Sequence, residues 1–207
     1  MESGLRLPSS KKGGWRNYFI TVLGCGMLLV GLYIAFTALA PQLYMKQALS
    51  EWNEPVVHAK KLTADRLYIP SIKLNIVYKS GGDDVLNDYA WHRFPERGDP
   101  KKGGNFIIAG HRFQLGFTPG ETRRKSPFYN VNLLQSGQSI YVDFKGVRYR
   151  YEITQHFEVK ATQVSIEAPT EDDRLTLYSC DLYNPKEIRE VIEAKLVEKN
   201  VDPEKKF

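Results

Sequence analysis

The chain has 207 residues, enough for one folded domain with additional segments, and it carries 29 basic and 24 acidic side chains. The positive excess is uneven. Residues 1–16 have a net charge of +3, residues 17–45 have no charged side chain, and the remainder, with 25 basic and 23 acidic residues, is nearly balanced. A nearly balanced domain lacks the basic surface that binds nucleic acid, so the composition argues against a DNA- or RNA-binding function.

An apolar run near the N-terminus predicts a membrane-spanning helix. Residues 18–40 would form a helix about 35 Å long, enough to cross the hydrocarbon core of a bilayer. Aromatic residues at both ends, Trp15 and Tyr44, are typical of membrane interfaces. A buried core helix would show a polar face, which this run lacks. A cleaved signal peptide is the alternative, because Ala38-Leu39-Ala40 resembles a cleavage site, but the run is longer than the usual apolar stretch of about 7–15 residues.

The basic residues precede the apolar run, which predicts an N-terminus in the cytoplasm. We therefore expect a single-pass protein of the cell membrane, with residues 1–16 cytoplasmic and residues 17–43 forming the anchor. Residues 44–66 are expected to form a polar stalk and residues 67–207 an extracellular domain. Cys25 lies inside the span and is expected to face lipid.

The extracellular part shows the pattern of a β protein. Short apolar segments at residues 67–69, 74–78 and 105–109 are bounded by Gly and Pro. Alternating residues on both sides of Lys145-Gly146 predict a hairpin. The fold class is therefore mainly β, with a closed or nearly closed barrel and short helices, one of them at residues 128–134.

Cys180 ends the segment Leu175–Cys180 and is the only cysteine outside the apolar run. Alternation along this segment places Leu175 and Leu177 in the core and Thr176 on the face of Cys180. A free thiol can be a small buried core residue. Outside the cell, however, it is exposed to oxidants, and its presence is easier to explain if its reactivity is used. Cys180 is therefore a candidate nucleophile.

A reactive thiol needs a base or a cationic neighbour. Among the four histidines, His111 directly follows a buried-looking strand that ends at Gly110, which predicts a side chain at the rim of the fold. His58 falls in the stalk, His92 is expected to pack in a loop, and His156 is expected to be solvated.

Two motifs in this order resemble the sortase family, the membrane-anchored cysteine transpeptidases of Gram-positive-type cell surfaces. They are the strand with its Gly-His step at residues 105–112 and the Thr-Leu-Tyr-Ser-Cys strand at residues 176–180. The Ile-Pro step within residues 67–72 resembles the first strand of that fold, and the single N-terminal anchor agrees with it. The resemblance covers residues 67–197 and implies a sortase-like closed β-barrel.

Carried over residue by residue, the resemblance makes Cys180 the nucleophile, His111 the proton-transfer partner and Arg189 the oxyanion stabiliser. Ser179 stands where the family usually has Thr, and both Ser179 and Thr176 are expected to contact the substrate. The resemblance implies cleavage of a Leu-Pro-x-Thr-Gly-like sorting signal on surface proteins through a thioacyl-enzyme intermediate. The carboxyl end then passes to an amine of a cell-wall precursor or a pilin lysine.

The segment that contains Arg189 has two readings. Asn184-Pro185 followed by apolar residues at helical spacing resembles a capped amphipathic helix, whereas the family implies a strand at residues 189–197. We predict the strand.

No cofactor is expected. Some sortases use calcium, and the acidic runs Asp83-Asp84 and Glu171-Asp172-Asp173 have suitable ligands, but solvated loops are the preferred interpretation. Two other functions stay open. One is a membrane-anchored, non-catalytic β-barrel binding module with Cys180 buried. The other is a Cys/His cell-wall transpeptidase of the L,D-type, whose Ser-x-Gly-Cys step this chain lacks.

Overall fold

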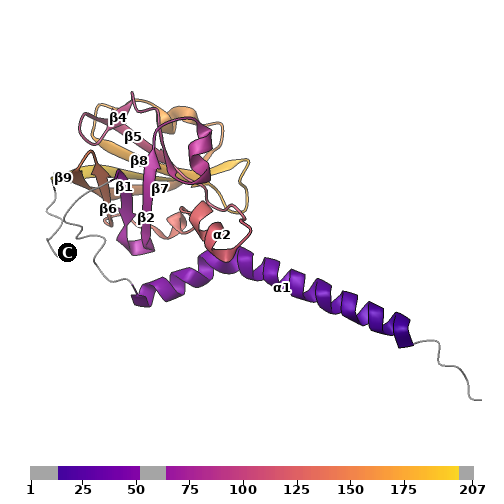
Figure 1. The fold of residues 1–207 in the computed structure, drawn as a ribbon. Helices are drawn as coiled ribbons and strands as arrows, with labels where there is room; N and C mark the ends of the chain where they lie inside the picture. The colour runs from indigo at the N-terminus through magenta and orange to yellow at the C-terminus, as the bar shows by residue number, and fades with distance from the viewer. Residues whose placement is uncertain (1–13, 52–63, 201–207) are drawn as a thin grey trace, which may run out of the picture.

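The computed structural model describes residues 14–51 and 64–200, with the side chains of residues 44–51 left out. Figure 1 shows a β-barrel with a long helix, α1, that touches the barrel near α2 and extends away from it. Helix α1 (Gly14–Glu51) covers the predicted anchor and continues past Pro41 into the predicted stalk. Its part Gly14–Leu43 is long and apolar enough to cross a membrane, as a signal sequence also can be. The predicted stalk residues 52–63 and the cytoplasmic segment 1–13 lie outside the described residues.

Nine strands and several short helices follow α1. The strands are β1 (Arg66–Ile69), β2 (Leu74–Lys79), β3 (Ala90–Arg93), β4 (Gly98–Asp99), β5 (Gly103–Ala109), β6 (Ser139–Phe144), β7 (Val147–Lys160), β8 (Arg174–Cys180) and β9 (Ile188–Lys199). The helices are α2 (Pro119–Lys125) and the 3-10 turns η2 (Pro70–Ile72), η3 (Asp83–Asn87), η4 (Val131–Leu133) and η5 (Val164–Glu167). The strand order is β3-β2-β1-β6-β7-β9-β8-β5-β4, and a further pairing of β3 with β5 closes eight of the strands into a ring. The predicted closed barrel is confirmed.

The hairpin predicted around Lys145-Gly146 is also confirmed. Strands β6 and β7 pair antiparallel from Phe144↔Val147 to Ser139↔Glu152. Both turn residues have positive φ angles, 49° at Lys145 and 81° at Gly146, which is the backbone form that matches the twist of a two-residue hairpin.

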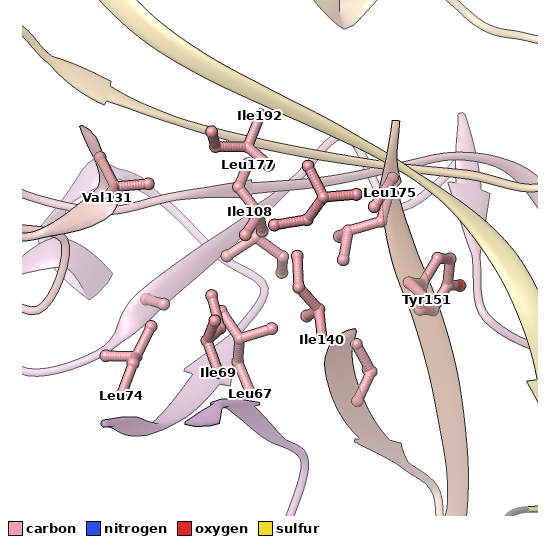
Figure 2. Close-up of a cluster of buried hydrophobic side chains, with 14 of the residues drawn as sticks. Leu67, Ile69, Leu74, Ile108, Val131, Ile140, Tyr151, Leu175, Leu177 and Ile192 are labelled. Atoms are coloured by element: carbon pink, nitrogen blue, oxygen red, sulfur yellow. The ribbon is translucent and has the colours of Figure 1, made fainter. Parts of the chain in front are cut away.

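Two apolar clusters lie on opposite faces of the sheet. The barrel interior is filled by aliphatic and aromatic side chains that converge from most of the strands (Figure 2). Leu175 and Leu177 of β8 belong to this interior cluster, as predicted from alternation. The second cluster, here called the outer cluster, consists of Ile107, Ala109, Val159, Tyr178 and Val191, with Trp91, Phe94, Phe157 and Ile166 against it.

The short helices differ from the sequence prediction. The segment predicted as a helix at residues 128–134 contains only the single 3-10 turn η4, in which Leu133 N–H donates to the Asn130 carbonyl over 3.0 Å. The helix forms earlier, as α2, because Thr118 caps it. The Thr118 hydroxyl accepts from Glu121 N–H over 3.1 Å, and Pro119 occupies the first turn. The capping pattern Thr-Pro-Gly-Glu was present in the sequence and is the signal that would have located it.

Candidate active site

The ends of β8 and β9 bring Cys180 and Arg189 together. The two strands are antiparallel neighbours, and their last pair in register is Cys180↔Arg189. Arg189 lies on a strand, so the strand prediction for this segment is confirmed over the amphipathic helix. Strand β9 pairs with β8 on one side and with β7 on the other. These two ladders of backbone hydrogen bonds stabilise the extended form of the segment.

His111 reaches the same place from β5. Strands β5 and β8 run parallel with Ala109 opposite Tyr178, and Gly110 N–H continues the pairing by donating to the Tyr178 carbonyl over 3.2 Å. The next residues, His111 and Cys180, therefore follow adjoining strand ends. A Cβ atom at Gly110 would come within 2.9 Å of the Phe128 ring, so the glycine in the Gly-His step is required by this close approach.

Alternation puts the three candidate residues on the face of the outer cluster. Cys180 lies two residues after Tyr178, Arg189 two residues before Val191, and His111 two residues after Ala109, and those three neighbours all belong to that cluster. Cys180 is partly exposed and has no disulfide bond. This partial exposure does not match the non-catalytic alternative, which expects a buried Cys180.

The two nitrogen-bearing side chains differ in their surroundings. His111 is partly buried, and loss of solvent lowers its pKa below the usual value of 6.5, so the neutral imidazole is favoured. The Arg189 Nη1 group donates to the carbonyls of Pro185 over 2.8 Å and Ile188 over 3.0 Å. These bonds hold the guanidinium close to the backbone of its own strand and loop.

The loop from Cys180 to Arg189 is ordered by Asp181. Its Oδ1 atom accepts from the backbone N–H groups of Tyr183 over 2.9 Å and Asn184 over 2.6 Å. Burial alone would raise the pKa of Asp181, but these donors and the charge of Arg112 outweigh it and lower the pKa below its usual value. The carboxylate therefore stays ionised and keeps the loop closed on itself.

A buried ionic group lies on the opposite, interior face of the same strand ends. Arg112 Nη1 pairs with Glu190 Oε2 over 3.2 Å, and both side chains are nearly inaccessible to solvent. The other carboxylate oxygen of Glu190 contacts His156 Nε2, whose Nδ1 lies 3.0 Å from the Leu134 carbonyl. The prediction that His156 is solvated is wrong, because its ring bridges β9 and the segment after η4.

The sequence reading also missed Arg112 and Glu190. Each is the immediate neighbour of a candidate catalytic residue, His111 or Arg189, so one buried ion pair connects the two chain segments that carry them. Carboxylate oxygens of Glu158, Asp181 and Glu190 lie within 4.8 Å of one another, and Arg112 supplies the opposing charge. The sequence did carry a signal for this pair in residues 188–191, Ile-Arg-Glu-Val. On a strand, alternation places Glu190 on the core side, and a buried carboxylate needs a charged or hydrogen-bonding partner.

A second polar group fixes the outer face beside Cys180. The Tyr178 hydroxyl donates to Glu167 Oε1, and Arg93 Nη1 both donates to that hydroxyl and pairs with Glu167 over 2.7 Å. Burial and the neighbouring carboxylate raise the pKa of Tyr178, so it stays protonated. The contacts hold η5, on the connection between β7 and β8, against strands β3 and β8.

Thr176 and Ser179, which were expected to contact the substrate, are buried. Thr176 is 0% exposed and donates to Asn105 Oδ1 over 2.7 Å. Asn105 in turn donates to the carbonyls of Ile166 and Ala168, so Thr176 supports the connection between β7 and β8. Ser179 is 2% exposed and lies opposite Glu190 in register. Neither side chain is available to a substrate in this arrangement.

Two hollows among the described residues lie away from the candidate site. One is lined by α2, η2 and Pro41 and the other by β2, β3 and the β6–β7 turn. The acidic runs considered for calcium also lie elsewhere. Asp83 and Asp84 are exposed in η3, whereas Asp172 and Asp173 pair with Arg174 and Lys199.

Comparison with known proteins decides the family. The profile of the Sortase domain matches residues 67–197, which is more than half of the chain. The chain belongs to the sortase family. This is the transpeptidase family that the two strand motifs resembled, and the L,D-type alternative is set aside. No curated protein matches the chain.

Solved sortases share the fold at low identity. Sortase A of Listeria monocytogenes aligns with a TM-score of 0.57 and 22% identity, over 66% of this chain and 88% of that chain. Sortase D5 of Clostridium perfringens aligns with a TM-score of 0.55 and 21% identity, over 77% of this chain and 99% of that chain. Sortase E of Streptomyces avermitilis aligns with a TM-score of 0.53 and 25% identity, over 65% of this chain and 88% of that chain. Relatives with three different class letters have similar scores, so the fold does not assign this sortase to a class.

Proposed function

We propose that this sortase is a cysteine transpeptidase that anchors proteins to the cell surface. The observation that supports it is the meeting of Cys180, His111 and Arg189 at adjoining ends of β8, β5 and β9, on one face of the barrel. A nucleophile, a proton-transfer group and a fixed cation on one face are the set that acyl transfer requires.

In the first step, the His111 imidazole accepts the thiol proton of Cys180, and the sulfur attacks a backbone carbonyl carbon of the bound peptide. Arg189 donates hydrogen bonds to the oxyanion that develops. The tetrahedral species collapses as the C–N bond breaks, and the His111 imidazolium protonates the leaving amine. The carboxyl part of the peptide remains on Cys180 as a thioester.

In the second step, an acceptor amine attacks the thioester carbonyl. His111 takes the proton from the attacking nitrogen, and Arg189 again stabilises the oxyanion. The C–S bond breaks to release a new peptide bond, and the His111 imidazolium returns the proton to the departing sulfur, which restores the Cys180 thiol and the neutral imidazole. Transfer to an amine instead of water requires the acceptor to be bound beside the thioester.

The substrate of the proposal is a Leu-Pro-x-Thr-Gly-like sorting signal near the C-terminus of a surface protein, cut between Thr and Gly. The acceptor is an amine of a cell-wall precursor or a pilin lysine. Two structural relatives support a peptide substrate in general terms. Sortase E1 of Streptomyces coelicolor was solved with a tripeptide in its active site, and the structure of Streptococcus pneumoniae sortase C was related to pilin substrate specificity.

In the same proposal α1 is a retained anchor. The basic residues of the N-terminal segment stay in the cytoplasm, and the barrel lies outside the cell. Confinement of the enzyme and a membrane-tethered substrate to one surface raises their effective concentration.

The proposal is tested by incubating the full chain in detergent with a panel of Leu-Pro-x-Thr-Gly-like peptides, with and without an amine acceptor. We expect amine-dependent products whose masses equal the peptide up to the threonine joined to the acceptor, and a covalent adduct on Cys180 in the absence of amine. A scrambled peptide is the control. Cleavage at other positions, or products without an adduct on Cys180, would contradict the mechanism.

The environment of His111 predicts the pH dependence of the reaction. The mechanism needs a neutral imidazole to accept the thiol proton, so protonation of His111 in the free enzyme removes activity. Because burial lowers the pKa of His111, the acid-side decline of kcat/KM is expected below pH 6.5. Measurement of kcat/KM from acidic to mildly alkaline pH checks this. A decline centred above pH 6.5 would show that His111 does not control that limb.

A further inference from the structure

A group of exposed apolar side chains follows His111 on the segment that leads to α2. Phe117 is 87% exposed, Leu115 51% and Phe113 38%. The residues 113–117 are here called the apolar loop. Contiguous exposed apolar surface marks a site of interaction with a protein or a membrane, and the surroundings of this loop decide between them.

The apolar loop lies directly against the helix that is apolar enough to cross a membrane. The Tyr33 hydroxyl of α1 donates to the Phe117 carbonyl over 2.7 Å. In the next two turns of α1, Thr37 and Ala40 are only 3% and 1% exposed. Figure 1 shows α2 resting on α1 where the helix meets the barrel. The depth of Tyr33 in a bilayer therefore sets the depth of the apolar loop.

Charge and length place Tyr33 at the outer boundary of the hydrocarbon core. Arg16 is the last charged residue before the apolar run, and a core of about 30 Å takes about 20 helical residues. Counted from Asn17, those residues end at Phe36. Tyr33 then lies within one helical turn of the boundary, at the level that tyrosine favours. Phe117, bonded to Tyr33, lies at the same level, beside the outer ends of the lipid chains.

Basic side chains lie at the height that suits the lipid phosphates. Arg123 and Arg124, at the end of α2, line a hollow together with Pro41 of α1. Asp88 lines it as well and lies 3.9 Å from Arg124, but both side chains are exposed, so Arg124 can reach a phosphate instead. Pro41 is five residues beyond Phe36, or about 7.5 Å along the helix axis, which falls within the headgroup layer of a bilayer. Positive groups at this height are attracted by anionic lipids.

We propose that the apolar loop inserts into the outer leaflet of the membrane, with Arg123 and Arg124 of α2 against the lipid phosphates. The inference rests on the retained anchor of the proposed function. It gives the barrel a fixed orientation on the bilayer instead of free rotation at the end of a stalk. Because the loop begins two residues after His111, the candidate site is held beside the membrane surface.

Depth-dependent fluorescence quenching tests the insertion without using enzyme activity. The full chain with Cys25→Ser and Cys180→Ser receives one new cysteine, Leu115→Cys or Phe117→Cys, and a polarity-sensitive fluorophore. Val164→Cys is the matched control, because Val164 is apolar and 69% exposed but belongs to η5, on the connection between β7 and β8. A separate variant, which carries only Cys180→Ser and is labelled at its native Cys25, reports whether α1 spans the bilayer. All are reconstituted into phosphatidylcholine–phosphatidylglycerol bilayers that contain nitroxide lipids.

We expect nitroxides high on the acyl chain to quench the labels at positions 115 and 117 several-fold more than the label at position 164, and deep nitroxides to quench the label at Cys25. If Cys25 is quenched but positions 115 and 117 match position 164, the insertion is wrong, and the apolar loop contacts protein instead. If Cys25 is not quenched either, the retained anchor is wrong as well. The peptide-transfer assay in detergent is independent of all these outcomes.

Discussion

Replacement of Cys180 with alanine is expected to abolish peptide transfer, lowering kcat/KM by on the order of 10³-fold or more. In the proposed mechanism the Cys180 sulfur forms the thioester, so its loss leaves His111 and Arg189 without a nucleophile to assist. Cys180 is partly exposed at a strand end, so its truncation leaves the two apolar clusters intact. The measurement is transfer of a cleavable peptide to an amine, followed by mass spectrometry.

The chain provides a matched control in its other cysteine. Cys25→Ala removes a thiol from α1, far from the strand ends, and should leave the rate unchanged. Cys180→Ser keeps the shape but supplies a much poorer nucleophile at neutral pH, so it should behave like the alanine variant. Retention of more than a small fraction of the parent rate in Cys180→Ala, with the Cys25→Ala control active, would remove Cys180 from the mechanism.

Replacement of Glu190 with glutamine is expected to lower the free energy of unfolding by about 2–3 kcal/mol. The carboxylate is 6% exposed and meets both Arg112 and His156, so the amide removes the counter-charge that the buried Arg112 guanidinium contacts directly. The carboxylates of Asp181 and Glu158 remain nearby and compensate part of the loss, whereas Arg112 Nε already lacks a hydrogen-bond partner among the described residues. Chemical unfolding of the full chain in detergent, followed by near-UV circular dichroism, measures the change.

Glu198→Gln on the same strand is the control for this variant. Glu198 pairs with Arg150 over 3.2 Å, but both side chains are about one-third exposed, where solvent screens the pair. Its loss should cost at most about 1 kcal/mol. Equal destabilisation by the two substitutions would show that the Arg112–Glu190 pair contributes no more than a surface contact.

Sequence patterns predicted the elements whose periodicity is local. The β6–β7 hairpin followed from alternation and a two-residue turn, and the interior position of Leu175 and Leu177 followed from alternation in β8. The strand of Arg189 is different. Its local pattern slightly favoured a helix, and pairing with β7 and β8, which no local pattern records, determined the outcome.

The candidate site was predicted only in part for the same reason. Cys180 and His111 stood out because each ends a recognisable strand. Arg112, Glu190 and His156 did not, because a buried ion pair depends on which strands become neighbours, and these residues are 78 and 34 positions apart. Thr176 was placed on the correct face of β8, but alternation cannot show that Asn105 and the connection before β8 cover that face.

The closed ring has a consequence for when the candidate site is assembled. Strand β5 pairs with β8 over a sequence separation of 69 positions, from Asn105↔Arg174. Strand β9, the last strand of the ring in sequence, must enter between β7 and β8. Contacts between such distant segments form late and slowly, since a long stretch must first be ordered. A chain that lacks β9 therefore carries Cys180 without Arg189 beside it, and the candidate site is complete only when the last strand has joined the ring.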